Sequence, residues 1–424
     1  MTTQFKAEVF QNKYLPQGTQ EVHAIMTVTL VEGDGVAANP TTEKMFGVIC
    51  DISGSMGGEK IHAAKEAMIK IVHLLPEDIS FFIITGSSKA TVIFPVSKAT
   101  PENKEIAIAA IKKIHPNGAT VISRWLFEAL KQFKTTPNAL RQALLLTDGQ
   151  NNESDENQLR DVLQACEGVF ECDCRGVGTD WQVKQLQEIS NKLLGTTDII
   201  PNPAMIEADF QKILEKAISK NVSDVSLRLW TPQSAKVLFC KQVSPDIVDL
   251  TKRVKLVTIQ ISDYPTGAWA QNESRDYHFC IQVQPGNVGD EMLAGRASLI
   301  YKENGIETKV GEARILTIWT DDDAKSTKID RTVAHYTGQA ELAQSIQEGL
   351  EARDLGNIEI ATAKLGKAVQ LAHKSGNEAT AKLLKKVVDI EDAATGTVRL
   401  KRDIAKEDAM ALETRSTKTT RISK

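Results

Sequence analysis

The feature that most constrains the fold is the alternation of apolar runs and amphipathic segments between residues 42 and 220. Met45–Cys50 and Ala143–Thr147 are continuous apolar runs, typical of central parallel strands that are covered on both faces. Between them, apolar positions such as Ile61 and Ala64 recur at helical spacing. This alternation predicts a Rossmann-like α/β domain over 42–220, with a mostly parallel sheet and helices on both of its faces.

The segments on either side of this domain follow other patterns. Residues 221–320 carry short alternating runs separated by turns such as Tyr264–Gly267, which predicts an antiparallel β-sandwich. We assign the strands expected in residues 1–40 to this sandwich, which makes the α/β domain an insertion in it. The alternative is that the sandwich simply follows the α/β domain. Helical stripes over 330–393 predict a helical hairpin or small bundle. Residues 394–424 end in a polar stretch and are expected to be disordered.

The composition narrows the classes of function. The 424-residue chain has 51 basic and 55 acidic residues and a net charge of −4, which argues against a sequence-independent nucleic-acid binder. No apolar run approaches the length of a membrane span, and Met1–Val9 lacks the apolar core of a signal peptide. The six scattered cysteines, including Cys172 and Cys174, favour buried free thiols in a reducing compartment over a zinc site. We therefore expect a cytoplasmic protein with no nucleic-acid partner and no membrane span.

The chemistry is concentrated at Asp51-Ile-Ser53-Gly-Ser55, between a buried strand and a helix. Ligands of open α/β sheets bind at the carboxyl ends of the strands. Asp148 ends another apolar run, and Thr120 lies in a loop just before a helix, so both are expected at the same edge of the sheet. Carboxylate and hydroxyl oxygens suit Mg²⁺, Mn²⁺ or Ca²⁺ rather than a soft metal.

The five residues Asp51, Ser53, Ser55, Thr120 and Asp148 resemble, in order and context, the metal-ion-dependent adhesion site of von Willebrand factor A domains. The resemblance covers about residues 42–220. It implies that these five side chains hold a divalent cation directly or through water. The whole chain is similar to a bacterial cytosolic subset of the family with a flanking sandwich and a helical C-terminal region. That resemblance implies Ser/Thr kinases, phosphatases and forkhead-associated domain proteins as partners.

A non-enzymatic, metal-dependent protein-interaction module is the function we expect, with the cation coordination completed by a partner's Asp or Glu. One alternative is a hydrolase that uses the metal as a Lewis acid. Its weakness is that no general base is evident beside the site. The other alternative is a scaffold in which the ion only stabilises the fold.

The polar end of the chain is a second candidate site. Thr419 has Ile422 three residues on, a spacing that forkhead-associated domains read, and Lys418 and Arg421 supply flanking positive charge. Phosphorylation would add strong acceptor oxygens and negative charge. The candidate residues are Thr419, Thr420 and Thr417, and the alternative is a solvated end without function.

Overall fold

A computed structural model gives the fold of most of the chain. It describes residues 2–32, 36–37, 43–136, 139–303 and 306–421. Two compact units result, one of residues 39–221 and one that combines residues 1–38 with residues 222–424. The α/β unit is therefore an insertion in the chain of the other unit, which is the first of the two arrangements expected from the sequence.

The inserted unit is built on one sheet with the strand order β10-β9-β8-β5-β6-β7. Its strands are β5 (Lys44–Asp51), β6 (Ser80–Gly86), β7 (Ala90–Lys98), β8 (Leu140–Thr147), β9 (Glu171–Val177) and β10 (Thr197–Ile200). All neighbours are parallel except β6 and β7, which pair antiparallel at the edge. Every residue of β6 is buried, as expected for a central strand with both faces covered.

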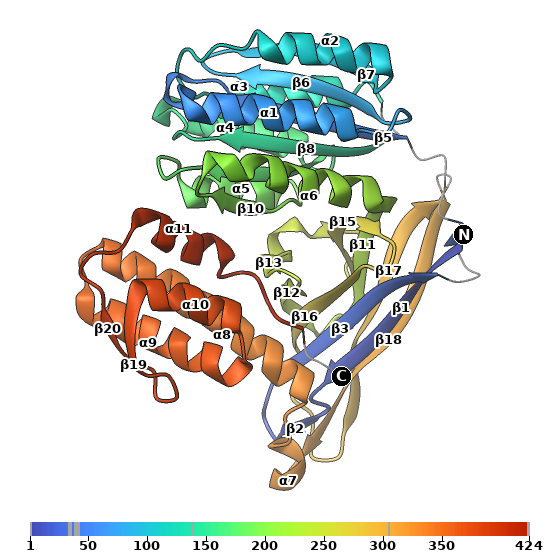
Figure 1. The fold of residues 1–424 in the computed structure, drawn as a ribbon. Helices are drawn as coiled ribbons and strands as arrows, with labels where there is room; N and C mark the ends of the chain where they lie inside the picture. The colour runs from blue at the N-terminus through green and yellow to red at the C-terminus, as the bar shows by residue number, and fades with distance from the viewer. Residues whose placement is uncertain (1, 33–35, 38–42, 137–138, 304–305, 422–424) are drawn as a thin grey trace. The chain divides into compact units, whose positions relative to one another are not determined.

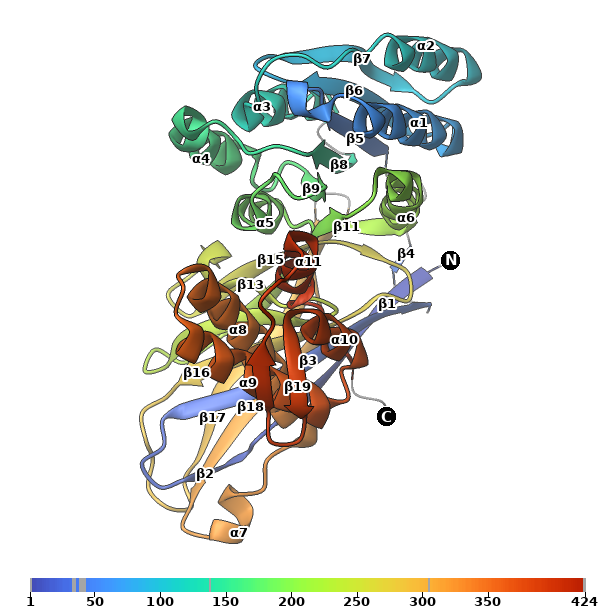
Figure 2. The ribbon, with the colours of Figure 1, turned by 60° about the vertical axis from the view of Figure 1, so that its left-hand side comes forward.

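Helices cover both faces of this sheet (Figure 2). One face carries α1 (Glu59–Leu74), α2 (Pro101–Lys112) and α6 (Ile206–Ser219), and the other carries α3 (Ile122–Phe133), α4 (Glu156–Cys166) and α5 (Val183–Lys192). On the first face, Val48 and Cys50 of β5 pack with Ile61 and Met68 of α1 in one apolar core. These are the helical and strand periodicities that the sequence predicts.

The second unit contains a β-sandwich of two six-stranded sheets, ordered β13-β12-β16-β3-β1-β4 and β14-β15-β11-β17-β18-β2. The strands are β1 (Thr2–Gln11), β2 (Tyr14–Pro16), β3 (Glu21–Glu32), β4 (Val36–Ala37), β11 (Lys220–Trp230), β12 (Lys236–Ser244), β13 (Val248–Asp249), β14 (Lys255–Leu256), β15 (Ile261–Ala270), β16 (Ser274–Gln282), β17 (Glu291–Glu303) and β18 (Ile306–Thr320). Strand β3, before the insertion, pairs antiparallel with β16, after it (Figure 1). The two sheets share one core, to which β3 contributes Met26 and β17 contributes Leu299.

One turn expected from the sequence is wrong. Tyr264–Gly267 lies inside β15 instead of between strands. Within the described residues, β14 pairs with β15 only at Asp263 and Ser262. Pro265 therefore stands next to a largely free strand edge, where a proline is tolerated in a sheet.

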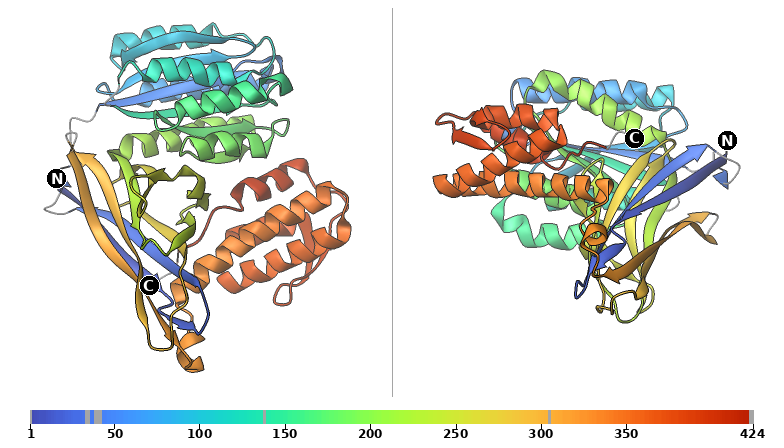
Figure 3. Two further views of the ribbon diagram at one scale, coloured as in Figure 1. Left: turned by 180° about the vertical axis from the view of Figure 1, so that it is seen from behind. Right: turned by 90° about the horizontal axis from the view of Figure 1, so that it is seen from below.

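The helical region consists of α8 (Arg331–Asp354), α9 (Ile358–Ser375) and α10 (Glu378–Val387), after the short α7 (Asp323–Ser326). Helices α8 and α9 lie side by side (Figure 3). Gly376 ends α9 in the left-handed conformation with φ of 64°, a C-cap that glycine adopts without strain. The expected helicity does not extend to residue 393, because β19 (Val388–Asp392) pairs with β20 (Thr397–Leu400) in a hairpin.

The expectation of disorder over residues 394–424 is wrong for the part that the structure describes. Besides β20, this stretch forms α11 (Lys406–Arg415), whose Leu412 joins the core of the helical region. Beyond α11 the chain pairs with the sandwich, since Ile247 N–H donates to Thr417 O at 2.8 Å and Thr419 N–H donates to Pro245 O at 2.9 Å. Backbone pairing therefore orders a segment that has few apolar side chains. Ile422 lies outside the described residues.

Candidate metal centre

Asp51 is the last residue of β5, and its carboxylate is fully buried at the carboxyl end of the sheet. Its Oδ1 accepts a hydrogen bond from the backbone N–H of Ser53 at 2.7 Å, and its Oδ2 accepts one from the hydroxyl of Thr147 at 2.5 Å. Thr147 is the last residue of β8, the parallel neighbour of β5. The carboxylate is thus fixed from two adjacent strands.

The two serines link this carboxylate to Asp148. The hydroxyl oxygens of Ser53 and Ser55 lie 3.0 Å apart, and the Ser55 hydroxyl donates to Asp148 Oδ1 at 2.7 Å. Ser55 lies in a short 3₁₀ turn, Gly54–Met56, that joins β5 to α1. The turn bends the chain enough to bring both serine side chains back over the sheet edge.

Thr120 belongs to the loop that precedes α3, and backbone hydrogen bonds tie this loop to the other two segments. Asn117 N–H donates to Ile52 O at 2.7 Å, and Gly54 N–H donates to Gly118 O at 3.0 Å. On the other side, Asn152 N–H donates to Thr120 O at 3.0 Å. The loop is therefore held between the segments that follow β5 and β8.

Gly149 marks the point where the hydroxyl groups meet. A methyl group on its α-carbon would lie 3.0 Å from the Thr120 hydroxyl oxygen, 3.4 Å from that of Ser55 and 4.0 Å from that of Ser53. Ser55 bonds to the Asp148 carboxylate and Ser53 to that of Asp51, so the hydroxyls and the two carboxylates form one set of hard oxygen donors. That donor set fits Mg²⁺, Mn²⁺ or Ca²⁺. The structure thus brings together all five residues singled out in the sequence.

Two buried carboxylates and one lysine set the electrostatics of the site. Burial is the largest cause of a raised pKa for Asp51, and the nearby Asp148 carboxylate raises this pKa further. The hydrogen bonds from Thr147 and Ser53 act in the opposite direction. The Nζ atom of Lys60, on α1, lies 2.6 Å from Asp148 Oδ2. Sequence reasoning missed Lys60, which lies in the first turn of α1 and 88 residues from Asp148 in sequence.

Two further residues missed in the sequence position the Thr120 loop. Asn151 Oδ1 accepts the N–H of Ile122 at 2.8 Å, and the buried Asp155 carboxylate accepts both the N–H and the hydroxyl of Ser123. They supply acceptors for N–H groups at the start of α3 that have no partner within the helix. Both come from the segment between β8 and α4, which includes the 3₁₀ turn Glu153–Asp155.

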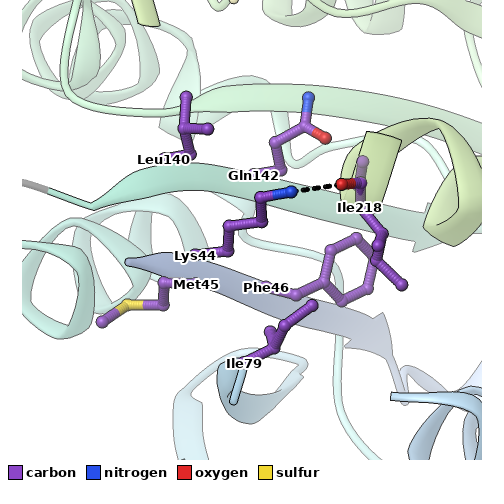
Figure 4. Close-up of a pocket in the computed structure, with 8 residues that line it drawn as sticks. Lys44, Met45, Phe46, Ile79, Leu140, Gln142 and Ile218 are labelled. Carbon is purple, nitrogen blue, oxygen red and sulfur yellow. Dashed lines mark hydrogen bonds between the residues drawn. The ribbon is translucent and has the colours of Figure 1, made fainter. Parts of the chain in front are cut away.

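A small pocket in the same unit lies at the other end of the sheet (Figure 4). Lys44 and Leu140, which line it, are the first residues of β5 and β8. The Lys44 ammonium group donates to the carbonyl oxygen of Ile218 there. The pocket is therefore separate from the oxygen-rich centre, which lies at the carboxyl ends of the same strands.

Comparison with known proteins identifies the family. The structure resembles that of a protein described as von Willebrand factor type A from Catenulispora acidiphila, with a TM-score of 0.93. The two sequences are 42% identical, and the match covers 99% of this chain and 98% of the other. This chain belongs to the von Willebrand factor type A family. The family model of the von Willebrand factor type A (vWA) domain matches residues 48–199, and that of the type A C-terminal domain matches residues 370–416.

Other proteins resemble this chain over all or part of its length. The ArnB paralog VWA2 from Sulfolobus acidocaldarius has the same fold over 99% of this chain and 98% of its own, with a TM-score of 0.61 and 13% identity. An uncharacterized Synechocystis protein is 24% identical over 48% of this chain and 49% of its own length. The rat inter-alpha-trypsin inhibitor heavy chain H3 is 24% identical over 58% of this chain and 29% of its own. The chain thus spans half or less of the length of these two curated relatives.

The C-terminal threonines of the vWA chain lie in contact with the sandwich and α8. The Thr419 hydroxyl donates to Val243 O at 2.7 Å, and the Thr420 hydroxyl accepts from the Gln339 amide at 2.7 Å. Next to them, Arg421 pairs with the buried carboxylate of Asp276 at 3.1 Å. The candidate phosphorylation sites therefore belong to an ordered strap, residues 417–421, rather than to a free tail.

None of the described helices combines the length and apolar character that crossing a membrane requires.

Proposed function

We propose that this vWA domain binds a divalent cation, Mg²⁺ or alternatively Mn²⁺ or Ca²⁺, and uses it to bind a partner protein. Asp51, Ser53, Ser55, Thr120 and Asp148 hold the ion, and an Asp or Glu of the partner completes its coordination. The observation that carries the proposal is the meeting of three hydroxyls near Gly149, with the buried carboxylates of Asp51 and Asp148 bonded to Ser53 and Ser55. The bound ion supplies positive charge that attracts the partner's carboxylate.

The rim of the site supports binding of another protein. Gly54, Ser55, Gly118 and Ala119 are exposed, whereas the carboxylate of Asp51 is buried below them. Their small side chains leave room for an incoming carboxylate. The buried acidic groups, in contrast, are out of direct reach of a partner's positively charged residues.

A binding role fits this set of side chains better than hydrolysis does. Among the described residues, the five side chains form hydrogen bonds with hydroxyls, backbone groups, carboxylates and Lys60. None involves a histidine. His62, which follows the serine loop, is exposed on α1. A hydrolase would need a general base within hydrogen-bond reach of the attacking water.

The decisive experiment compares the full chain with Asp51→Ala and Gly149→Ala. Asp51→Ala removes a charged ligand, so we expect Mg²⁺ affinity to fall at least about 100-fold, beyond the effect typical of an outer-shell residue. Gly149→Ala places a methyl group among the three hydroxyls and should also weaken binding. Isothermal titration calorimetry measures the affinity, and circular dichroism checks the fold.

Affinity capture from lysate, with Mg²⁺ and with chelator, tests the partner. Capture by the wild type only in Mg²⁺, and not by Asp51→Ala, is the expected result. Capture that persists in Asp51→Ala with chelator contradicts the proposal. Metal-dependent turnover in a phosphatase and protease screen would favour the hydrolase, and a large Mg²⁺-dependent rise in melting temperature without any captured partner would favour the scaffold.

We further propose that the protein acts in the cytoplasm and that a Ser/Thr kinase modifies Thr417, Thr419 or Thr420, which creates a site for a forkhead-associated domain. All six cysteines are free and buried, as is usual in a reducing compartment. A phosphate on Thr419 removes the proton that bonds to Val243 O, so modification should release the strap. Intact-mass measurement after co-expression with a Ser/Thr kinase tests this, and an unchanged mass rules it out for that kinase.

A further inference from the structure

The sandwich carries a second group of side chains with metal-ligating atoms, separate from the vWA domain. Glu21 and His23 lie on β3, and Cys280 lies opposite His23 on the neighbouring strand β16. Their ligand atoms, one from each residue, lie within 4.8 Å of one another. The group thus joins two strands that flank the inserted domain in sequence and pair directly in the sandwich (Figure 1).

Two of the three distances between these atoms are close to those of a tetrahedral site. His23 Nε2 lies 3.7 Å from Cys280 Sγ and 3.7 Å from Glu21 Oε2. For zinc, with bonds of about 2.0 Å to nitrogen or oxygen and 2.3 Å to sulfur, adjacent ligands at the tetrahedral angle lie about 3.3–3.6 Å apart. Small side-chain movements would bring the atoms to this spacing.

A fourth residue orients the central ligand. His278, also on β16, is buried, and its Nε2 lies 3.1 Å from Nδ1 of His23. When His278 accepts this hydrogen bond, His23 carries its proton on Nδ1, and the Nε2 lone pair is left free to face Glu21 and Cys280. A hydrogen bond to the second ring nitrogen is the usual support of a metal-bound histidine. The ring of Phe239 packs edge-on against the His278 ring, with 4.9 Å between the ring centroids, and restrains it.

The three side chains differ in exposure, which leaves a metal ion a route to the group from solvent. Cys280 is 1% exposed, whereas the side chains of His23 and Glu21 are 33% and 57% exposed. An ion can therefore approach from the side of Glu21 and His23 and reach the sulfur last.

We propose that Glu21, His23 and Cys280 form a binding site for a zinc-class divalent ion, with His278 as the positioning residue of His23. A thiolate and an imidazole select Zn²⁺ or Co²⁺ over Mg²⁺ and Ca²⁺. Three protein ligands leave one coordination position for water or an external ligand. The ion would cross-link β3 and β16 and so stabilise the sandwich across the point of insertion.

Co²⁺ titration of the full chain in excess Mg²⁺ tests the site, because a cobalt–thiolate bond gives a charge-transfer band in the near ultraviolet. The oxygen donors around Asp51 cannot produce this band. We expect one equivalent of Co²⁺ to develop it and Cys280→Ser to abolish it. Cys240→Ala is the matched control, because Cys240 is a buried thiol of the same sandwich and lies in its core; it should keep the band.

Glu21→Gln provides a second variant that leaves the fold intact, since this side chain is largely exposed. It should weaken Co²⁺ binding at least tenfold without loss of the sandwich's circular dichroism. The proposal is overturned if the wild type gives no band, if the band persists in Cys280→Ser, or if Glu21→Gln binds Co²⁺ like the wild type.

Discussion

Lys60 places an ammonium group beside one of the two buried carboxylates of the candidate metal centre. Its Nζ lies 2.6 Å from Asp148 Oδ2, and the side chain is 25% exposed. The same carboxylate accepts the Ser55 hydroxyl through Oδ1. A divalent cation at the centre would have to share Asp148 with this ammonium group, so the two positive charges compete.

Replacement of Lys60 by methionine should therefore strengthen Mg²⁺ binding. Methionine keeps much of the aliphatic length of lysine and removes its charge. Relief of the repulsion between the ammonium group and the ion predicts a gain of about threefold to tenfold in affinity. Calorimetric titration of the full chain measures it. Lys65→Met, on the same helix but bonded to the carbonyl oxygen of Lys112, is the control and should leave the affinity unchanged. Weaker binding by Lys60→Met would mean that the lysine supports the site.

At this scale the sequence indicates the candidate ligands better than it indicates the residues that support them. Asp51, Ser53 and Ser55 share one short loop, so their residue types and spacing are visible in the chain. Thr147 and Lys60 act through single hydrogen bonds to carboxylates that lie 96 and 88 residues away in sequence. Such pairings depend on how β5, β8 and α1 pack together, and no local pattern shows them.

At the scale of elements, the segment between β8 and α4 holds the loop of Thr120 in place. Asp155 is buried and accepts two hydrogen bonds from Ser123 at the start of α3, while Asn152 binds the backbone of Thr120 itself. Asp155 does not touch the point near Gly149 where the hydroxyls meet. It is therefore a positioning residue, and its effect on metal binding must pass through Thr120.

Asp155→Ala should weaken both the fold and metal binding. It leaves the N–H and hydroxyl of Ser123 without their acceptor, at a cost of about 2 kcal/mol in the free energy of unfolding. Mg²⁺ affinity should fall roughly tenfold, as for other outer-shell residues. Denaturant unfolding and calorimetric titration measure the two effects.

A double-mutant cycle separates positioning from general destabilisation. If Asp155 acts through Thr120, Asp155→Ala should reduce Mg²⁺ affinity little further once Thr120→Ala is present. Fully additive losses would contradict this route. Asp161→Ala, an exposed carboxylate on α4, is the matched control and should change neither quantity.

The elements that the sequence predicts well are those with a strong periodic pattern. The continuous apolar runs of β5 and β8 predict buried strands, and the apolar residues at helical spacing in α1 predict a helix. Where the pattern is weak, long-range pairing decides the structure. The segment Tyr264–Gly267 has the residue types of a turn but lies within β15. The polar strap after α11 is ordered by backbone hydrogen bonds to residues 245–247. In both cases the segment with which the chain pairs cannot be identified from the local sequence.

At the scale of the whole molecule, each of the two units has a hydrophobic core of its own. Among the described residues, the buried side chains of the core formed with α1, α2 and α6 run from Phe46 to Leu214, and those of the sandwich core combine residues 5–30 with residues 222–319. Strand β3 lies before the insertion, and its partner β16 lies after it. The order of the segments along the chain therefore does not require the two units to fold together.

Residues 43–221, expressed alone, should fold and bind Mg²⁺ with an affinity within about threefold of the full chain, since ~180 residues suffice for an independent core. The complementary protein, residues 1–37 joined to 222–424 by a short Gly/Ser linker, should keep the sandwich and lose Mg²⁺ binding. Circular dichroism, thermal unfolding and calorimetric titration of both proteins test this. The five candidate oxygen ligands lie in the first protein, whereas Glu21, His23 and Cys280 lie in the second. We therefore expect the first protein to bind Mg²⁺ and the second to bind Co²⁺. An unfolded 43–221 fragment, or Mg²⁺ binding by the complementary protein, would contradict this division of the chain.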